Sequence, residues 1–95
     1  MPAVRLLLFA RAREAAGRRD DTVDLVAGAT LDDVLAIARE RYPPEFAKVL
    51  GASRVWVNGD EPAVGGATPL SDGDEVAVLP PVSGGGHEEG PRYPD

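Results

Sequence analysis

The chain has 95 residues, which is enough for one domain and too few for two. Sixteen acidic residues against ten Lys and Arg give a net charge of −6, and this balance argues against nucleic acid or an anionic membrane as the main partner. The absence of cysteine excludes disulfides, thiolate nucleophiles and cysteine-based metal sites, and no apolar run approaches the roughly 20 residues that span a bilayer.

The N-terminal part shows no signal-peptide cleavage pattern, so we expect a cytoplasmic protein. Residues 4–10 (VRLLLFA) are an almost unbroken apolar run of strand length. This pattern predicts a central strand, covered on one face by a helix and partly on the other. Residues 12–17 predict one helical turn ending at Gly17, and residues 22–26 (TVDLV) predict a second strand after a turn at 18–21.

A helix is predicted to begin after Thr30, because Asp33 follows at the spacing of a capping pair. Apolar residues at positions 31, 34, 35 and 38 then repeat with the period of one helix face. Pro43 and Pro44 end this helix, since neither can donate a helical hydrogen bond. We expect it to be the one long helix, followed by a less regular stretch.

The second half of the chain predicts short strands separated by turns. Residues 54–57 form a third strand that ends at the turn-forming pair Asn58-Gly59. Residues 61–64 can pair weakly as an edge strand, as Pro62 indicates. Residues 68–74 have turn composition, and residues 75–79 (EVAVL) form the last strand.

This order of elements predicts an α+β fold, a mixed sheet of four to five strands crossed by one main helix. The residues expected in its core are Val4, Leu6, Leu8, Val23, Leu25, Leu31, Val34, Leu35, Ala38, Val55, Val57, Leu70, Val76 and Val78.

The usual catalytic constellations are missing from the sequence. The only histidine, His87, lies in a Gly- and Glu-rich tail, and no serine in the folded part has a histidine to activate it. The acidic residues at 72–75 fit a solvated turn better than a cation site. We therefore expect no stand-alone enzyme and no metal site.

The composition of the segment at 79–85 (LPPVSGG) favours a stiff, extended and narrow thread. Two prolines hold the chain extended where it leaves the last strand, and Gly84 and Gly85 add no side chains. From Pro80 to Gly85 such a thread reaches roughly 20 Å at about 3.3 Å per residue, so it can enter a narrow tunnel in another protein. By composition alone, a plain Gly-rich exit into a tail is the more common explanation.

Three segments resemble the MoaD/ThiS family of sulfur carriers, and within it the MoaD branch of molybdopterin synthase small subunits. They are VRLLLFARAREAAG at the start, LSDGDEV before the last strand, and PPVSGG directly after that strand. The resemblance covers residues 1–85 and favours the thread over the plain exit.

The resemblance implies a ubiquitin-like β-grasp fold and a chemistry centred on Gly85. An E1-like adenylating enzyme of the MoeB type would use ATP and magnesium to activate the terminal carboxylate, and a sulfur donor would convert it to a thiocarboxylate. A MoaE-like large subunit would accept Gly84 and Gly85 and use the sulfur to build the dithiolene of molybdopterin. The chain itself would bind no cofactor.

The resemblance also implies which residues meet the partners. The apolar stem and the thread would contribute Leu79, Pro80, Pro81, Val82 and Ser83. Phe9 and Arg13 match family positions that face the partner, although Phe9 also fits a core position and Arg13 a solvated turn.

One feature departs from the family, whose members end at the glycine pair. Here residues 86–95 follow, and the Gly85 carbonyl is held in an amide with Gly86. Either a processing protease cuts between Gly85 and Gly86, or the protein is no longer a carrier. The tail is too poor in apolar residues to fold, so we expect a carrier domain at 1–85 and a disordered tail at 86–95.

Two alternatives remain open. The activated terminus can supply sulfur to another pathway, such as cysteine or thiamine synthesis, or modify lysines as a ubiquitin-like tag. The chain can also be a non-catalytic β-grasp binding module whose terminus stays blocked.

Overall fold

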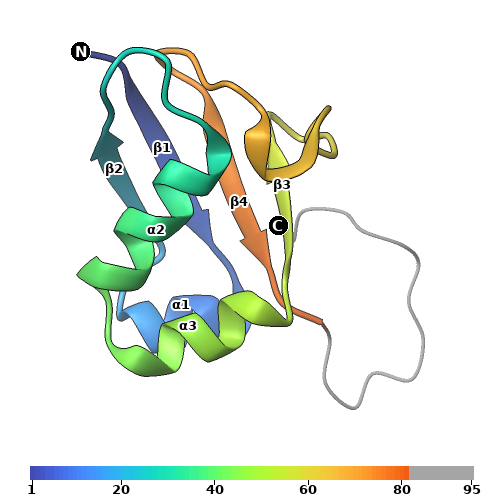
Figure 1. Ribbon diagram of the computed structural model, residues 1–95. Helices are drawn as coiled ribbons and strands as arrows, with labels where there is room; N and C mark the ends of the chain where they lie inside the picture. The colour runs from blue at the N-terminus through green and yellow to red at the C-terminus, as the bar shows by residue number, and fades with distance from the viewer. Residues whose placement is uncertain (82–95) are drawn as a thin grey trace.

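The computed structural model describes residues 1–81, so the thread from Val82 onward lies outside the described residues. Its four strands are β1 (Ala3–Leu8), β2 (Asp20–Asp24), β3 (Arg54–Val57) and β4 (Glu75–Leu79). They form one sheet in the order β2-β1-β4-β3 (Figure 1). The central pair, β1 and β4, is parallel, and both outer strands are antiparallel to their neighbours. The α+β mixed sheet predicted from the sequence is confirmed.

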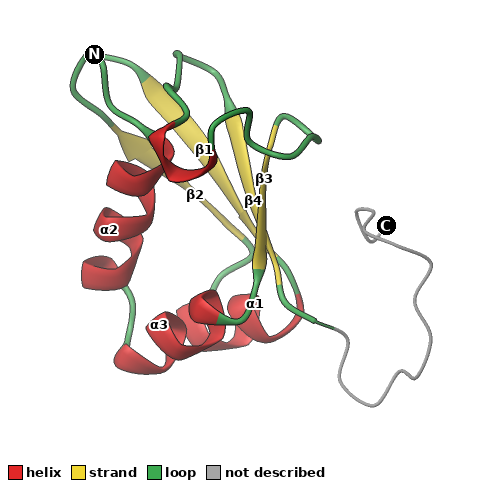
Figure 2. Ribbon diagram, turned by 45° about the vertical axis from the view of Figure 1, so that its right-hand side comes forward, coloured by secondary structure: helices red, strands yellow, loops and turns green. Residues whose placement is uncertain are grey.

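The helices are α1 (Ala10–Ala16), α2 (Leu31–Arg41) and α3 (Pro44–Gly51), with a short 3-10 helix η1 at Gly65–Ala67. Figure 2 shows α2 and α3 on one side of the sheet and α1 beyond the end of β1. Within residues 1–81 the opposite side carries no helix, and we call it the open face. None of the helices in this part of the chain is long and apolar enough to cross a membrane.

The core lies between the sheet and α2 and α3. Alternate residues of β1, Val4, Leu6 and Leu8, are at most 1% exposed, because a strand turns every second side chain to the same face. The predicted core is confirmed, except that Leu35, Val55 and Val57 are only partly buried and pack against its margin. The core also contains residues that the sequence analysis left out: Ala12, Ala29, Tyr42, Phe46 and Leu50.

Helix α3 corrects the expectation of a single helix followed by an irregular stretch. Helix α2 ends at Arg41, ahead of the proline pair as predicted, but Pro44 then begins a second helix. Proline is well tolerated at a first helical position, where its missing N–H has no partner to lose. Phe46, Val49 and Leu50 had the helical spacing that would have predicted this element.

Two strand boundaries are also corrected. Strand β2 begins at Asp20, two residues before the expected start, so Asp20 and Asp21 belong to the sheet and not to the turn. Residues 61–64 form no strand. After the tight turn at Asn58-Gly59, Asp60 forms an isolated bridge with Val57, and no strand is present between β3 and η1.

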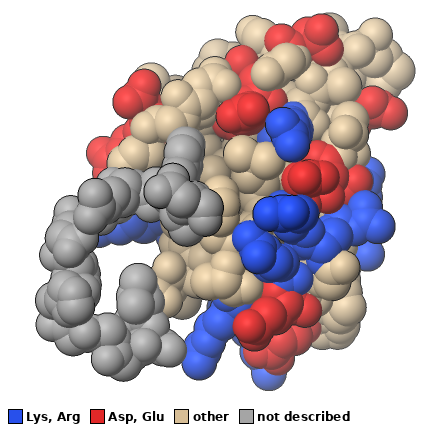
Figure 3. Space-filling view, turned by 180° about the vertical axis from the view of Figure 1, so that it is seen from behind, with Lys and Arg blue, Asp and Glu red and all other residues tan. Residues whose placement is uncertain are grey.

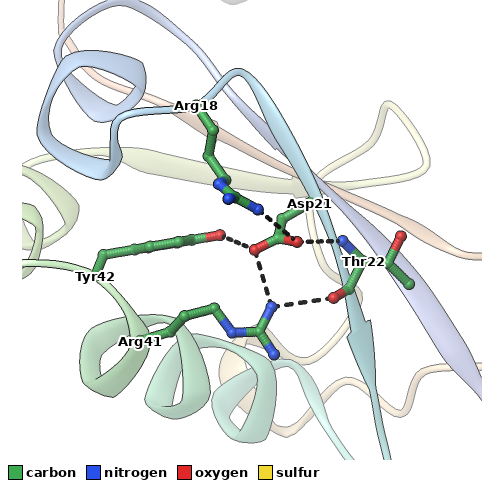
Figure 4. A network of polar contacts seen from close by, with 5 residues as sticks. All are labelled: Arg18, Asp21, Thr22, Arg41 and Tyr42. Carbon is green, nitrogen blue, oxygen red and sulfur yellow. Dashed lines mark hydrogen bonds and ion pairs between the residues drawn. The ribbon is translucent and has the colours of Figure 1, made fainter.

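A polar network fastens the edge strand β2 to the end of α2 (Figure 4). Asp21 Oδ2 accepts hydrogen bonds from the Tyr42 hydroxyl at 2.7 Å and from Arg41 Nη1 at 2.9 Å. Its other oxygen lies 3.1 Å from Arg18 Nη1 and accepts the Thr22 N–H at 2.9 Å. Burial raises the pKa of Asp21, but the hydrogen bonds from Tyr42, Arg41 and Thr22 outweigh burial and lower it to about 2.

We expect Asp21→Asn to lower the free energy of unfolding by about 2 kcal/mol at neutral pH. This is the free energy that corresponds to lowering the pKa of Asp21 from 3.8 to about 2 on folding. Because the folded-state pKa is the lower one, this stabilisation is complete above pH of about 4 and is lost as the pH falls towards about 2. Urea denaturation across that range measures it. Asp24→Asn, in the same strand but exposed, is the control and should change stability by less than about 0.5 kcal/mol. Equal losses in the two variants would contradict the assignment.

Candidate functional site

The described part of the chain ends in two prolines that directly follow β4. Leu79, the last residue of β4, lies opposite Arg54 of β3. Pro80 and Pro81 follow, and neither has an N–H with which to continue the ladder, while both restrict φ. Leu79 and Pro80 are half-buried and Pro81 is exposed. A stiff stem therefore carries the thread out from a central strand.

The remaining thread residues, Val82, Ser83, Gly84 and Gly85, and the expected cleavage position before Gly86 lie outside the described residues. Their assigned roles stay predictions.

An apolar row crosses the open face beside this stem. Leu7 of β1 lies opposite Ala77 of β4, which in turn lies opposite Trp56 of β3. Ala77 is only 1% exposed although it points away from the core, as expected for a small side chain flanked by two large ones. The row lies on the same face of the sheet as Leu79, which follows Ala77 by two residues in β4.

Phe9 and Arg13 line a groove at the end of β1. The groove has a volume of about 310 Å³ and is formed by Arg5, Leu7, Leu8, Phe9, Arg13, Arg19 and Asp20. Phe9 is half-buried outside the hydrophobic core, so the alternative of a core position is wrong for this residue. Arg13 is exposed and belongs to α1, not to a turn. Contact of either residue with a partner stays a prediction.

The end of β4 and the groove are neighbours because β1 and β4 run parallel and finish at the same end of the sheet. Leu8 lies opposite Val78, and the Phe9 N–H donates a hydrogen bond to the Val78 carbonyl at 3.3 Å. The stem and the groove therefore form one candidate site.

The charge of this site is opposite to that of the whole chain. Figure 3 shows a cluster of basic side chains on the open face, with acidic side chains beside it. Arg5 lies 3.5 Å from Asp20 and 3.9 Å from Glu75, whereas Arg13 and Arg19 form no ion pair with another residue of the described part. The groove is thus suited to a partner that presents carboxylates beside an apolar surface.

Sequence reasoning missed Arg5, Leu7, Arg19 and Asp20. The apolar run at 4–10 did contain a signal for Leu7, since a strand that is apolar on both faces must place some of its side chains opposite the core. No comparable signal exists for Arg19, because the direction of a side chain next to a turn depends on the turn geometry.

Among residues 1–81, no three His, Cys, Asp or Glu side chains come together as a group that could hold a metal ion. Asp21, whose pKa is lowered, lies on the opposite side of the sheet, next to the end of α2. What the geometry provides is a stiff exit for the thread, an apolar row and a basic groove.

The fold and the site define the class of this protein. A mixed sheet with a parallel central pair, helices over one face and a C-terminal thread leaving a central strand is the arrangement of ubiquitin-like β-grasp proteins. The sequence pattern of the ThiS family matches residues 6–85, a match that includes the thread and stops at Gly85. The chain belongs to the ThiS family of β-grasp sulfur carriers.

Individual relatives agree with this assignment. The molybdopterin synthase sulfur carrier subunit of Chlamydomonas reinhardtii is 35% identical over 86% of this chain and 98% of its own length. Small archaeal modifier protein 1 of Haloferax volcanii is 39% identical over 82% of this chain and 95% of its own.

Solved structures agree as well. The crystal structure of that Haloferax volcanii protein superposes with a TM-score of 0.77 at 33% identity, over 87% of this chain and 99% of that one. One chain in the solved complex of subunits 1 and 2 of the Helicobacter pylori molybdopterin-converting factor matches with a TM-score of 0.63 at 26% identity. The match covers 87% of this chain and 99% of that chain.

Proposed function

We propose that residues 1–85 act as the sulfur carrier of molybdopterin synthesis once the bond between Gly85 and Gly86 has been cut. An oxygen of the freed Gly85 carboxylate attacks the α-phosphate of ATP on an E1-like adenylating enzyme of the MoeB type, forming an acyl-adenylate and releasing pyrophosphate. Hydrosulfide from a sulfur donor then displaces AMP, and the terminus becomes a thiocarboxylate. A MoaE-like large subunit accepts the Gly84-Gly85 thread and takes its sulfur for the dithiolene.

The observation that carries this proposal is the family match through Gly85, on a thread that leaves a central strand by way of Pro80 and Pro81. The absence of cysteine adds a chemical argument, because no side chain of this protein can hold sulfur as a thiolate or persulfide. A carboxylate is a poor electrophile until it is adenylated, which explains why the thread must reach into a partner.

The proposed partner surface is the apolar row with the adjoining groove. Leu7, Trp56 and Leu79 supply apolar area, Phe9 an aromatic edge and Arg13 a guanidinium at the rim. The complex of two subunits seen for the Helicobacter pylori protein supports a MoaE-like large subunit as the occupant. The same surface suits the adenylating enzyme, since the thread must enter both proteins at different stages.

ATP and magnesium belong to the adenylating partner in this proposal. Phosphates need backbone N–H groups at a glycine-rich loop before a helix, or a cluster of cations with a metal ligand nearby. Gly65 and Gly66 belong to η1, which is too short for such a cradle.

Mass spectrometry of the protein expressed in its native host tests the proposal. We expect a chain that ends at Gly85 and is heavier than the free acid by the difference between one sulfur and one oxygen atom. Gly86→Pro is the matched control, because proline after the scissile bond resists most proteases, and this variant should stay uncut and free of sulfur. Normal molybdopterin synthesis with only the uncut chain present would refute the proposal.

One observation favours a second function. The 39% identity to small archaeal modifier protein 1 raises the alternative that activated Gly85 acylates lysine amines of other proteins. Peptide mapping for lysines joined to Gly85 tests this alternative. Conjugates in the unmodified strain, together with a normal molybdopterin content after deletion of this gene, would favour this alternative over the sulfur-carrier function. Loss of molybdopterin on deletion, with no conjugates in the unmodified strain, would exclude it.

A further inference from the structure

The sequence contains a single carboxamide side chain, and a glycine follows it directly. Asn58 is the only asparagine of the 95 residues, and glutamine is absent from them. An asparagine before glycine is prone to spontaneous deamidation, because no side chain at the next position shields the backbone nitrogen that attacks the carboxamide carbon. Asn58 is therefore the one position of this sequence at which deamidation can occur.

Asn58 and Gly59 are the two central residues of the tight turn after β3. Their φ angles are +53° and +85°, the left-handed values of a type I′ turn, which asparagine and glycine both adopt readily. Val57 and Asp60 close this turn with backbone hydrogen bonds in both directions, at 2.8 Å and 3.0 Å. The backbone of the turn suits asparagine and aspartate equally, so the effect of exchanging one for the other comes from the side chain.

The Asn58 side chain joins this turn to the start of β4. Its Nδ2 donates a hydrogen bond to Asp74 Oδ1 at 3.0 Å, and its Oδ1 accepts the Glu75 N–H at 2.9 Å. The Asn58 N–H in turn donates to the Glu75 carbonyl at 2.8 Å. Because both ends of the carboxamide are bonded to residues 74 and 75, its carbon is kept from turning back towards the Gly59 nitrogen.

The Asp74 carboxylate that receives Asn58 is itself fixed in place. Its other oxygen accepts the Ser71 N–H at 2.7 Å, and the Asp74 carbonyl accepts the Arg5 N–H at 2.9 Å. Within residues 1–81, no Lys or Arg forms an ion pair with Asp74. A second carboxylate in place of the Asn58 carboxamide would lie close to the first, with no hydrogen to donate and no cation to offset the repulsion.

We propose that Asn58 is a site of spontaneous deamidation, that its contact with Asp74 and Glu75 protects it, and that the modified residue cannot restore this contact. When the contact opens, the Gly59 nitrogen attacks the Asn58 carboxamide carbon. The side-chain nitrogen leaves as ammonia and takes the hydrogen of the Gly59 N–H with it. Water then opens the resulting succinimide at either carbonyl, giving aspartate or isoaspartate. One water is consumed and one ammonia is released, and no other reactant is needed.

The consequence is a permanent mark on molecules in which this contact has opened. Aspartate at position 58 loses the hydrogen bond to Asp74 and repels its carboxylate, and isoaspartate also lengthens the backbone of the turn by one carbon atom. Both products weaken the junction between β3 and β4. This junction lies at the opposite end of β4 from the stem, so the inference goes beyond the proposed function and does not depend on it.

The intact mass of the 95-residue chain measures the reaction, because no other residue contains a carboxamide. Deamidation replaces an NH2 group by OH, and a time course in slightly alkaline buffer gives the rate. We expect the folded chain to react more slowly than the same chain in concentrated urea by a factor of about 10 or more. Equal rates in the two states would overturn the proposal, and this comparison needs no variant to fold.

Asp74→Ala tests the contact itself. It removes the acceptor of the Asn58 carboxamide and keeps Asn58 and Gly59, so the folded variant should deamidate about 3- to 10-fold faster, the usual scale of one hydrogen bond. Asp24→Ala removes an exposed carboxylate of β2 and is the matched control, which should react at the rate of the unchanged chain. If the two variants reacted at the same rate, the contact with Asp74 would not be the protecting one.

Asn58→Asp measures the effect of the modification on stability. The lost hydrogen bond and the new repulsion should together raise the ratio of unfolded to folded chains by about 10-fold, measured by urea denaturation followed by circular dichroism. Lys48→Ala makes the same change in net charge on the exposed side of α3 and should alter this ratio by less than about 2-fold. Equal stability of the two variants would contradict the proposed consequence. Sulfur loading at Gly85 is measured separately, so either inference can fail while the other holds.

Discussion

A valine at position 84 is expected to slow sulfur loading of the trimmed chain by about 100-fold. Gly84 adds no side chain to the thread, and valine adds a branched one that widens it and restricts φ and ψ. Displacing a reacting group by about 1 Å in a partner's active site costs on the order of 100-fold in rate. The measurement is a time course of thiocarboxylate mass for chains ending at Gly85, with adenylating enzyme, ATP, magnesium and sulfur donor.

Glu40→Gln is the control for that experiment, since it changes an exposed side chain of α2, outside the candidate site. It should load within a few-fold of the unchanged thread. Equal loading of the valine variant would show that the thread does not enter a narrow tunnel, and the proposed role of the bare glycine pair would then be lost.

Phe46→Ala is expected to lower the free energy of unfolding by about 3 to 5 kcal/mol. The Phe46 side chain is 0% exposed, and its ring meets that of Tyr42 edge-on, with the ring centroids 5.0 Å apart. Its truncation loses this contact and leaves a cavity between α3 and the rest of the core. Since small domains are stable by about 5 to 15 kcal/mol, this single change removes a large share of the total.

Urea denaturation followed by the fluorescence of Trp56, the only tryptophan, measures this loss. Lys48→Ala is the matched control in the same helix, because its side chain is exposed and should contribute less than about 0.5 kcal/mol. A Phe46→Ala midpoint close to that of Lys48→Ala would show that α3 is not packed as the structure places it.

The two predictions concern different parts of the protein, the thread and the core. Phe46 and the core stabilise the sheet, and the sheet sets the place and direction from which the thread leaves. In the proposed function, each partner in turn supplies the working geometry of the thread. A destabilised core should therefore affect every step, whereas a change at Gly84 should affect loading and leave the unfolding free energy unchanged.

The parts of this fold that could be predicted from the sequence are those that depend on local sequence patterns. Strand β4, the start of α2 after Thr30 and the core face of β1 were all predicted, because alternation, capping and helical spacing act between residues that are close in the chain. The Thr30 N–H indeed donates to the Asp33 carboxylate at 2.8 Å. The thread at 79–85 was predicted in the same way, since proline stiffness and the bareness of glycine are properties of single residues, and from Val82 onward it stays a prediction.

Other features depended on contacts between distant segments, and only the tertiary structure decided them. The ends of β2 follow from its register with β1, in which Leu7 lies opposite Asp20. The groove exists because the parallel pairing of β1 with β4 brings Phe9 beside the stem, while α1 and the start of β2 place Arg13 and Arg19 at the same hollow. A sequence states which side chains are available. Which of them become neighbours across the sheet is set by the packing free energy of the whole domain, to which no local pattern gives access.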